Sequence, residues 1–140
     1  MSLTIPLRHT LRPLALLLFC WAVSTSGYAE DDAPIATAYV ELTPDFVVNY
    51  KSDDARLRYI KAGITIRTDI NQKALIEANM PLVRDALVMF LSARTSEQVT
   101  GAIAREQTRA DAATAVNDAL EAETGQTPVT DILFSSFVTQ

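Results

Sequence analysis

The spacing of apolar residues changes near the middle of this chain, from every second residue to helical spacing, and this change most constrains its fold. Between Leu57 and Arg67 apolar and polar residues alternate, as in a strand with one buried face. The apolar members are Ile60, Ala62, Ile64 and Ile66. After Pro81 the apolar residues recur at helical spacing, at Leu82, Val83, Ala86, Leu87, Phe90 and Leu91. The strand and the helix each have one apolar face that must be buried, so the change predicts a helix packed on a sheet.

Two shorter strands are predicted ahead of the alternating segment. Residues 38–42 predict the first, which ends at residues 43–45. Residues 46–50 are rich in β-forming side chains and predict the second. The polar residues 51–54 then form a turn, so the second strand and the alternating segment are expected to pair as a hairpin.

A short helix is predicted directly after the alternating segment. Asp69 or Asn71 is expected to cap a helix over residues 72–79. Pro81 is expected to start or kink the next turn, which leads into the amphipathic helix.

A second long helix and a final strand complete the chain. The helix is predicted over residues 102–123, and Gly125 ends it. Its apolar face is mostly small and permits close packing, at Ala112, Ala113, Val116, Ala119 and Leu120. Residues 128–140 predict the strand, with Ile132, Phe134 and Val138 on one face and Leu133 and Phe137 on the other. Because both faces carry apolar groups, this strand is expected to be central or covered on both sides.

The predicted order is three strands, two or three helices and one strand, with no internal repeat. Separate runs of strands and helices are typical of α+β domains. We therefore predict an α+β fold, in which two or three helices pack on a small, mainly antiparallel sheet.

Residues 1–29 have the pattern of a secretory signal. Arg8 and Arg12 supply positive charge ahead of ten apolar residues, positions 14–23. A helix of this length spans about 15 Å, which is half of a hydrocarbon layer that is ~30 Å thick. The apolar run is therefore expected to direct export rather than to span a bilayer.

Small residues mark where this signal ends. Gly27 and Ala29 occupy the positions that a signal peptidase recognises, so cleavage is expected between Ala29 and Glu30. An acidic lead over residues 30–37 and one folded domain over residues 38–140 would follow. The alternative is that the leader stays uncleaved and serves as a short membrane anchor.

Composition restricts what the cleaved product can bind. Loss of Arg8 and Arg12 leaves ten basic residues against 17 acidic ones, a net charge of −7, so nucleic acid is excluded as a partner. The single histidine, His9, and the single cysteine, Cys20, both lie in the leader. A domain without thiols suits an oxidising compartment, and we predict the periplasm.

The predicted domain offers little chemistry. Without histidine or cysteine, the usual zinc sites and Ser-His or Cys-His pairs are excluded. Scattered glycines give no loop that could cradle a phosphate. Two carboxylate pairs, Asp53 with Asp54 and Glu121 with Glu123, are interpreted as surface residues of a turn and a helix end. No catalytic, cofactor-binding or metal site is therefore expected.

Two alternatives stay open at this stage. Ser135-Ser136 are interpreted as packing residues, but a hydrolase would result if a lysine were buried beside a serine; the lysines considered are Lys51, Lys61 and Lys73. Arg84-Asp85 could form an ion pair between subunits or be solvated. The sequence does not identify a partner interface.

Several segments, in order and with similar spacing, carry a family resemblance. They are YVELTPDFVVNY (Tyr39–Tyr50), RLRYIKAGITIRT (Arg56–Thr68), MPLVRDALVMFLSAR (Met80–Arg94), VN (Val116-Asn117) and VTDILFSSFVTQ (Val129–Gln140). Together they resemble the flagellar basal-body-associated protein FliL family over nearly all of the predicted domain.

This resemblance implies a periplasmic domain similar to the stomatin-type fold. It also implies a non-enzymatic protein that forms homo-oligomers beside the stator units of the flagellar motor and supports swimming, swarming and chemotaxis. Cofactors and small-molecule substrates are not implied. Family members typically keep an N-terminal membrane helix, so the short leader here indicates a secreted paralogue without the usual anchor. The alternatives are a chain anchored in the inner membrane and facing the periplasm, and a periplasmic adaptor of the same fold that serves another envelope complex.

Overall fold

The alternating segment forms the central strand of a three-stranded antiparallel sheet. The computed structural model describes residues 34–53 and 55–140. In this part of the chain β2 (Arg58–Asp69) lies between β1 (Thr37–Tyr50) and β3 (Val129–Thr139), and pairs with each in antiparallel fashion. The predicted signal, its cleavage site at Ala29 and Glu30, and Asp54 lie outside the described residues.

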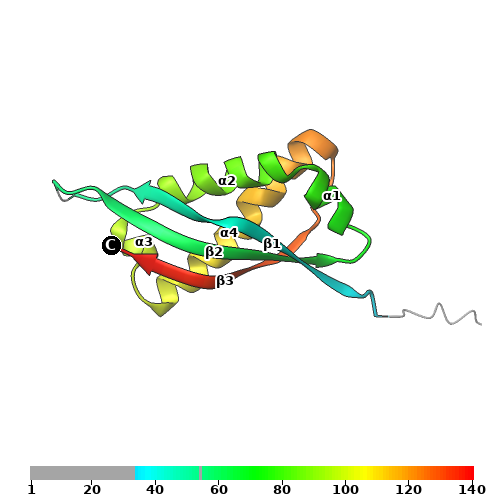
Figure 1. Cartoon of the computed structure of the whole chain (residues 1–140), viewed down its shortest axis with the longest axis horizontal. Helices are drawn as coiled ribbons and strands as arrows, with labels where there is room; N and C mark the ends of the chain where they lie inside the picture. Colours follow the sequence, from blue (N-terminus) through cyan, green and yellow to red (C-terminus); the bar gives the residue numbers. More distant parts are fainter. Residues whose placement is uncertain (1–33, 54) are drawn as a thin grey trace, which may run out of the picture. The chain divides into compact units, whose positions relative to one another are not determined.

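Four helices occur in the described residues, and the three longest lie on one side of the sheet (Figure 1). They are α1 (Lys73–Ala78), α2 (Met80–Ser92), α3 (Ser96–Val99) and α4 (Ala102–Thr124). The α+β class is confirmed, with one short helix, α3, beyond the predicted number. Gly125 ends α4 in a left-handed conformation (φ 73°), as predicted, and its N–H donates to the Glu121 carbonyl.

The start of α1 differs from the prediction. Gln72 occupies the N-cap position, and no side chain caps the helix. Asp69 Oδ1 instead accepts a hydrogen bond from the Asn71 N–H at 2.7 Å, which closes the turn at the end of β2. Pro81 lies in the first turn of α2, where a missing N–H costs nothing, so it starts this helix as predicted.

The helices bury the face of β2 that the alternation predicts. Ile60, Ala62, Ile64 and Ile66 are all at most 1% exposed. The helices contribute the buried side chains of Ile76, Val83, Leu87, Leu91, Val99, Ala112, Val116 and Leu120. The opposite face of the sheet is open in Figure 1, where no helix covers it.

The prediction of two separate strands before residue 51 was wrong, because residues 37–50 form one strand. Pairing moves from Leu42 with Ile64 to Phe46 with Ala62, so three β1 residues face one residue of β2. This irregularity adds an even number of residues, and the next side chains therefore return to the same face. Leu42 and Phe46 are both buried as a result.

The placement of the final strand was also wrong, because β3 is an edge strand with one face exposed. Phe134 pairs with Ile64 and Ser136 with Gly63, which leaves Ser135 as one extra residue. One extra residue reverses the faces of everything after it. Phe137 therefore joins Phe134 on the helix side, with ring centroids 4.8 Å apart, and Val138 is 46% exposed.

Gly63 lies opposite this bulge and leaves room for it. A methyl group placed on Gly63 would come within 2.4 Å of Ser135 Oγ and 3.0 Å of Ser136 Oγ. The Gly63 N–H donates to Ser136 Oγ at 2.9 Å. The close approach of β3 to the central strand thus depends on a residue without a side chain.

Candidate functional site

The residues considered for chemistry are dispersed over the surface. Asp53 is exposed in the turn after β1. Glu121 and Glu123 are both exposed on α4 and lie two residues apart, so they point to different sides of the helix. No group of three or more His, Cys, Asp or Glu side chains suited to a metal ion occurs among residues 34–53 and 55–140.

The serine and lysine side chains of the hydrolase alternative are not arranged as a nucleophile and its base. Lys61 is 56% exposed and its Nζ lies 3.9 Å from Asp45 Oδ2. Lys73 pairs on the surface with Glu77 at 3.7 Å. Ser136 Oγ accepts a backbone hydrogen bond from the central strand. No Ser–Lys hydrogen bond occurs within the described residues.

Arg84 contacts β1 of its own chain. Its Nη2 donates to the Pro44 carbonyl at 2.9 Å, and its guanidinium lies 4.3 Å from the centroid of the Phe46 ring. Asp85 is exposed. The arginine therefore stabilises the irregular part of β1, and this contact occupies the group that had been considered for an ion pair between subunits.

Polar side chains anchor the first half of β3 to the rest of the domain. Asn117 of α4 exchanges two hydrogen bonds with the backbone of Val129, at 2.8 and 2.9 Å. The buried hydroxyl of Thr68 donates to the Pro128 carbonyl at 2.6 Å. The start of β3 is thus fixed to both α4 and β2.

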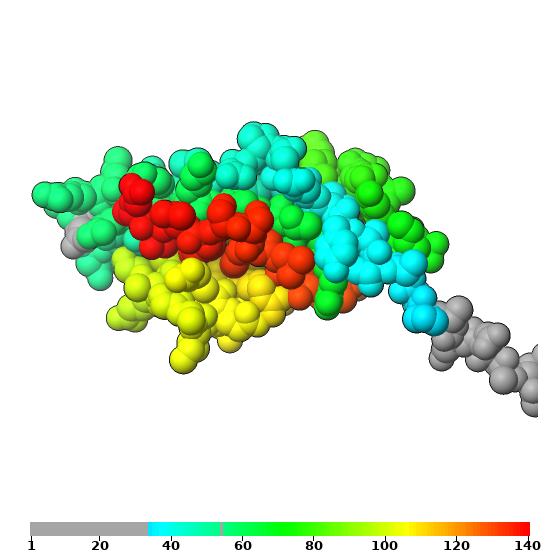
Figure 2. All heavy atoms as spheres, turned by 60° about the horizontal axis from the view of Figure 1, so that its bottom comes forward, coloured from blue at the N-terminus to red at the C-terminus, as the bar shows by residue number. Residues whose placement is uncertain are grey.

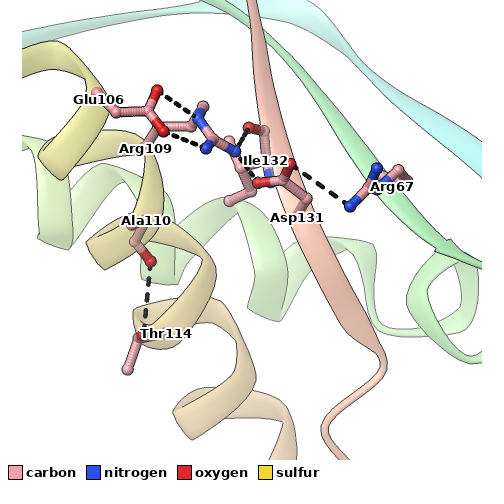
Figure 3. Close-up of polar contacts among 7 residues, drawn as sticks. All are labelled: Arg67, Glu106, Arg109, Ala110, Thr114, Asp131 and Ile132. Atoms are coloured by element: carbon pink, nitrogen blue, oxygen red, sulfur yellow. Dashed lines mark hydrogen bonds and ion pairs between the residues drawn. The ribbon is translucent and has the colours of Figure 1, made fainter.

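Arg109 of α4 anchors the middle of β3 (Figure 3). Its guanidinium bonds to the carboxylates of Glu106 and Asp131, and Nη1 also donates to the Ile132 carbonyl at 3.3 Å. Arg67 of β2 lies 3.8 Å from the other oxygen of Asp131. The hydrogen bond from Arg109 lowers the pKa of Glu106 below its ordinary value, and the same bond raises the pKa of Arg109. Both shifts favour the charged forms of Glu106 and Arg109.

An open groove follows this cluster, between the second half of β3 and the first half of α4. It has a volume of about 600 Å³ and is lined by residues 133–137 of β3 and by Ala102, Arg105, Glu106 and Arg109 of α4. Figure 2 shows β3 exposed along the surface, with α4 beside it. We name this feature the β3–α4 groove. Its floor is apolar and its α4 wall is charged.

Sequence reasoning missed this groove and the anchors that define it. Asn117 was noted as part of a motif, and a polar residue beside the apolar stripe of a helix is a signal that could have suggested a backbone contact. Arg109 and Asp131 lie 22 residues apart, so their pairing depends on how α4 and β3 meet. No local pattern in the sequence predicts that meeting.

None of the helices in the described residues is both long enough and apolar enough to cross a membrane.

Two comparisons with known proteins give a match to this chain. The family model for the flagellar basal body-associated protein FliL matches residues 39–140. A flagellar protein FliL of Aquifex aeolicus (strain VF5) is 30% identical over an alignment of 102 residues, which covers 71% of this chain and 60% of that protein. The chain thus spans less than two thirds of that relative's length. The matched region contains every helix and strand described above except the first two residues of β1, and the chain belongs to the FliL family of flagellar basal body-associated proteins.

Proposed function

We propose that this chain is a non-enzymatic component of the flagellar basal body that acts by binding motor proteins, including the stator, and that supports swimming, swarming and chemotaxis. The observation that carries the proposal is the family match over residues 39–140, which is nearly the whole described domain. A role in binding rather than in catalysis also agrees with the contacts of three polar side chains, which are structural. Asn117, Arg109 and Arg84 all hold strands in place.

Deletion of the gene tests this proposal. We expect a deletion strain to swim more slowly than its parent, and the deficit to grow with viscosity because the motor then works under load. A plasmid copy should restore swimming, and the empty plasmid is the control. Unchanged swimming and swarming at both low and high viscosity would contradict a motor role and would favour an adaptor for another envelope complex.

We also propose that the leader is removed on export and that the domain works in the periplasm. The support is the sequence pattern ahead of Glu30. Fractionation followed by intact-mass measurement should find a 111-residue species in the periplasm that begins at Glu30. A full-length chain that begins at Met1 or Ser2 in the inner membrane would contradict cleavage and would favour the anchored alternative.

A homo-oligomer is the third part of the proposal. The support is the open face of the sheet, which leaves room for a second copy, whereas the small side chains of α4 are buried within the domain. Light scattering over a range of concentrations should show a mass above that of one chain. A monomer at every concentration would contradict self-assembly in the absence of a partner.

A further inference from the structure

The second half of β3 has backbone groups that point away from the sheet. Tyr59 and Gln140 exchange both of their backbone hydrogen bonds, at 2.8 and 3.0 Å. Hydrogen-bonded and non-hydrogen-bonded pairs alternate along an antiparallel ladder. Thr139 and Phe137, which precede Gln140 by one and three residues, are therefore at non-hydrogen-bonded positions. Their N–H and C=O groups point towards the free edge.

The same holds on the other side of the bulge. Arg109 reaches the Ile132 carbonyl from α4, which places that carbonyl on the free edge. Phe134 lies two residues further along and has the same orientation. Arg109 thus occupies the outward carbonyl of Ile132, whereas no hydrogen bond within the described residues occupies the outward groups of Phe134, Phe137 or Thr139.

The β3–α4 groove runs beside this free edge and has an apolar floor. Phe134 and Phe137 lie in ring contact and pack partly against the core. Leu133, from the outer face, is 36% exposed and also lines the groove. On the α4 side Ala102 is small and leaves space. An extended segment laid along β3 could therefore gain backbone hydrogen bonds and apolar contact together.

The charges of the groove favour an acidic occupant. Arg105 and Arg109 line it with one acid, Glu106, in a chain whose net charge is −5. Arg109 is already paired with Glu106 and Asp131. Arg105 makes no ion pair or side-chain hydrogen bond within the described part of the chain, although it stands on the rim of the groove. A carboxylate of an incoming segment would meet this unpaired cation.

We propose that the β3–α4 groove binds an extended acidic segment of another protein, which adds to the edge of β3 as a further strand. The free outward groups run from Phe134 to Thr139, two residues beyond the lining of the groove, so the segment would lie along roughly 20 Å of strand. It would pair with Phe137 and Thr139 and cross the bulge towards Phe134. This inference rests on the proposed function in that it names the surface and the chemistry by which the chain would bind a partner protein.

Titration of the full chain with peptide probes tests the inference, with isotope-labelled backbone amides as the readout. The probe is an eight-residue peptide of alternating valine and glutamate, acetylated and amidated at its ends. We expect it to shift the amide signals of Phe134, Phe137 and Thr139. The matched control replaces each glutamate with lysine. It should bind at least about fivefold more weakly, because the ion pair between a glutamate and Arg105 is replaced by repulsion between a lysine and Arg105. Equal binding of the two peptides, or shifts elsewhere than β3 and α4, would overturn the proposal.

A charge reversal on the rim distinguishes binding in the groove from a general effect of the protein's net charge. Arg105→Glu should weaken binding of the acidic peptide at least about fivefold, whereas Arg56→Glu, an identical change in the loop before β2, should leave it unchanged. Equal weakening by both variants would mean that only net charge matters and would overturn the proposal. So would signals of the β3 edge that shift with protein concentration alone, because a second copy would then be the occupant. These measurements need no flagellum, so their failure would leave the motility test of the proposed function intact.

Discussion

The sheet ends in two edge strands, β1 and β3, which the rest of the domain secures in different ways. In β1 the edge is interrupted by Pro44, whose carbonyl accepts a hydrogen bond from Arg84. The end of β1 is tied as well, because the Lys51 N–H donates to the Arg94 carbonyl at 2.9 Å. Proline, irregularities and covering side chains are common means of preventing unwanted strand pairing.

In β3 the anchors stop about a third of the way along the strand, at the fourth of its 11 residues. Asn117 and Arg109 hold the residues from Val129 to Ile132, and the groove begins directly after them. The edge of the sheet at β1 is thus covered along the middle and end of the strand, whereas the edge at β3 is accessible along the last part of the strand. An accessible edge beside an apolar floor is a place where a partner strand can bind.

The largest expected effect comes from truncating the aromatic residue at each edge. Phe46 on β1 is 2% exposed and lies under Arg84, so Phe46→Ala should cost about 3–5 kcal/mol of the free energy of unfolding. Phe137 on β3 is only partly buried, so Phe137→Ala should cost about half as much or less. Urea denaturation measures both. Equal losses would mean that β3 is packed as tightly as β1, and the comparison would fail.

The next largest effect concerns the anchor at the start of β3. Asn117→Ala would leave the N–H and C=O of Val129 without their partners, which should cost about 1–3 kcal/mol of the free energy of unfolding. Asn49→Ala is the matched control, because Asn49 is exposed on β1 and should change stability by less than about 0.5 kcal/mol. If the two variants were equally stable, Asn117 would not anchor β3.

A smaller effect is expected where the bulge of β3 meets the central strand. Gly63→Ala should cost about 1–2 kcal/mol of the free energy of unfolding, because the new methyl group meets Ser135 Oγ. Adding Ser135→Ala removes that oxygen and should restore at least part of the loss. If the change in the free energy of unfolding of the double mutant equalled the sum of the two single changes, the bulge would not be the source of the strain.

The smallest effect is a pH dependence from the cluster around Arg109. The pKa of Glu106 is lower in the folded chain than its ordinary value of 4.5, because the carboxylate accepts hydrogen bonds from Arg109. A lowered pKa contributes stability above pH 4.5, and this contribution is lost as the pH falls through the folded value. Glu106→Gln should therefore lower the melting temperature slightly at neutral pH and not at acid pH. A difference from the parent that is the same at both pH values would contradict this assignment.

Much of the fold could be predicted because its signals are local. The alternation of Ile60, Ala62, Ile64 and Ile66 predicts the buried face of β2, and the spacing of Val83, Leu87 and Leu91 predicts that of α2. Gly125 predicts the end of α4 by its conformational freedom. Each of these depends on residues within a few positions of one another.

The errors arose where the pairing of strands decides the outcome. The extra residue at Ser135 reverses the faces of Phe137 and Val138, and it is recognisable only from the partner strand. The irregular residues 43–45 look like a break between strands, yet pairing continues on both sides of them. The groove was not predicted for the same reason, since it exists only where α4 and the edge of β3 meet.

Amide hydrogen exchange of the full chain tests the comparison of the two edges most directly. The amide of Lys51, which is tied to Arg94, should exchange slowly, as should the ladder amides of Leu133 and Val138. The outward amides of Phe134, Phe137 and Thr139 should exchange rapidly, at a rate that does not depend on protein concentration. Slow exchange at these three positions would mean that the edge of β3 is already covered, and it would contradict the account.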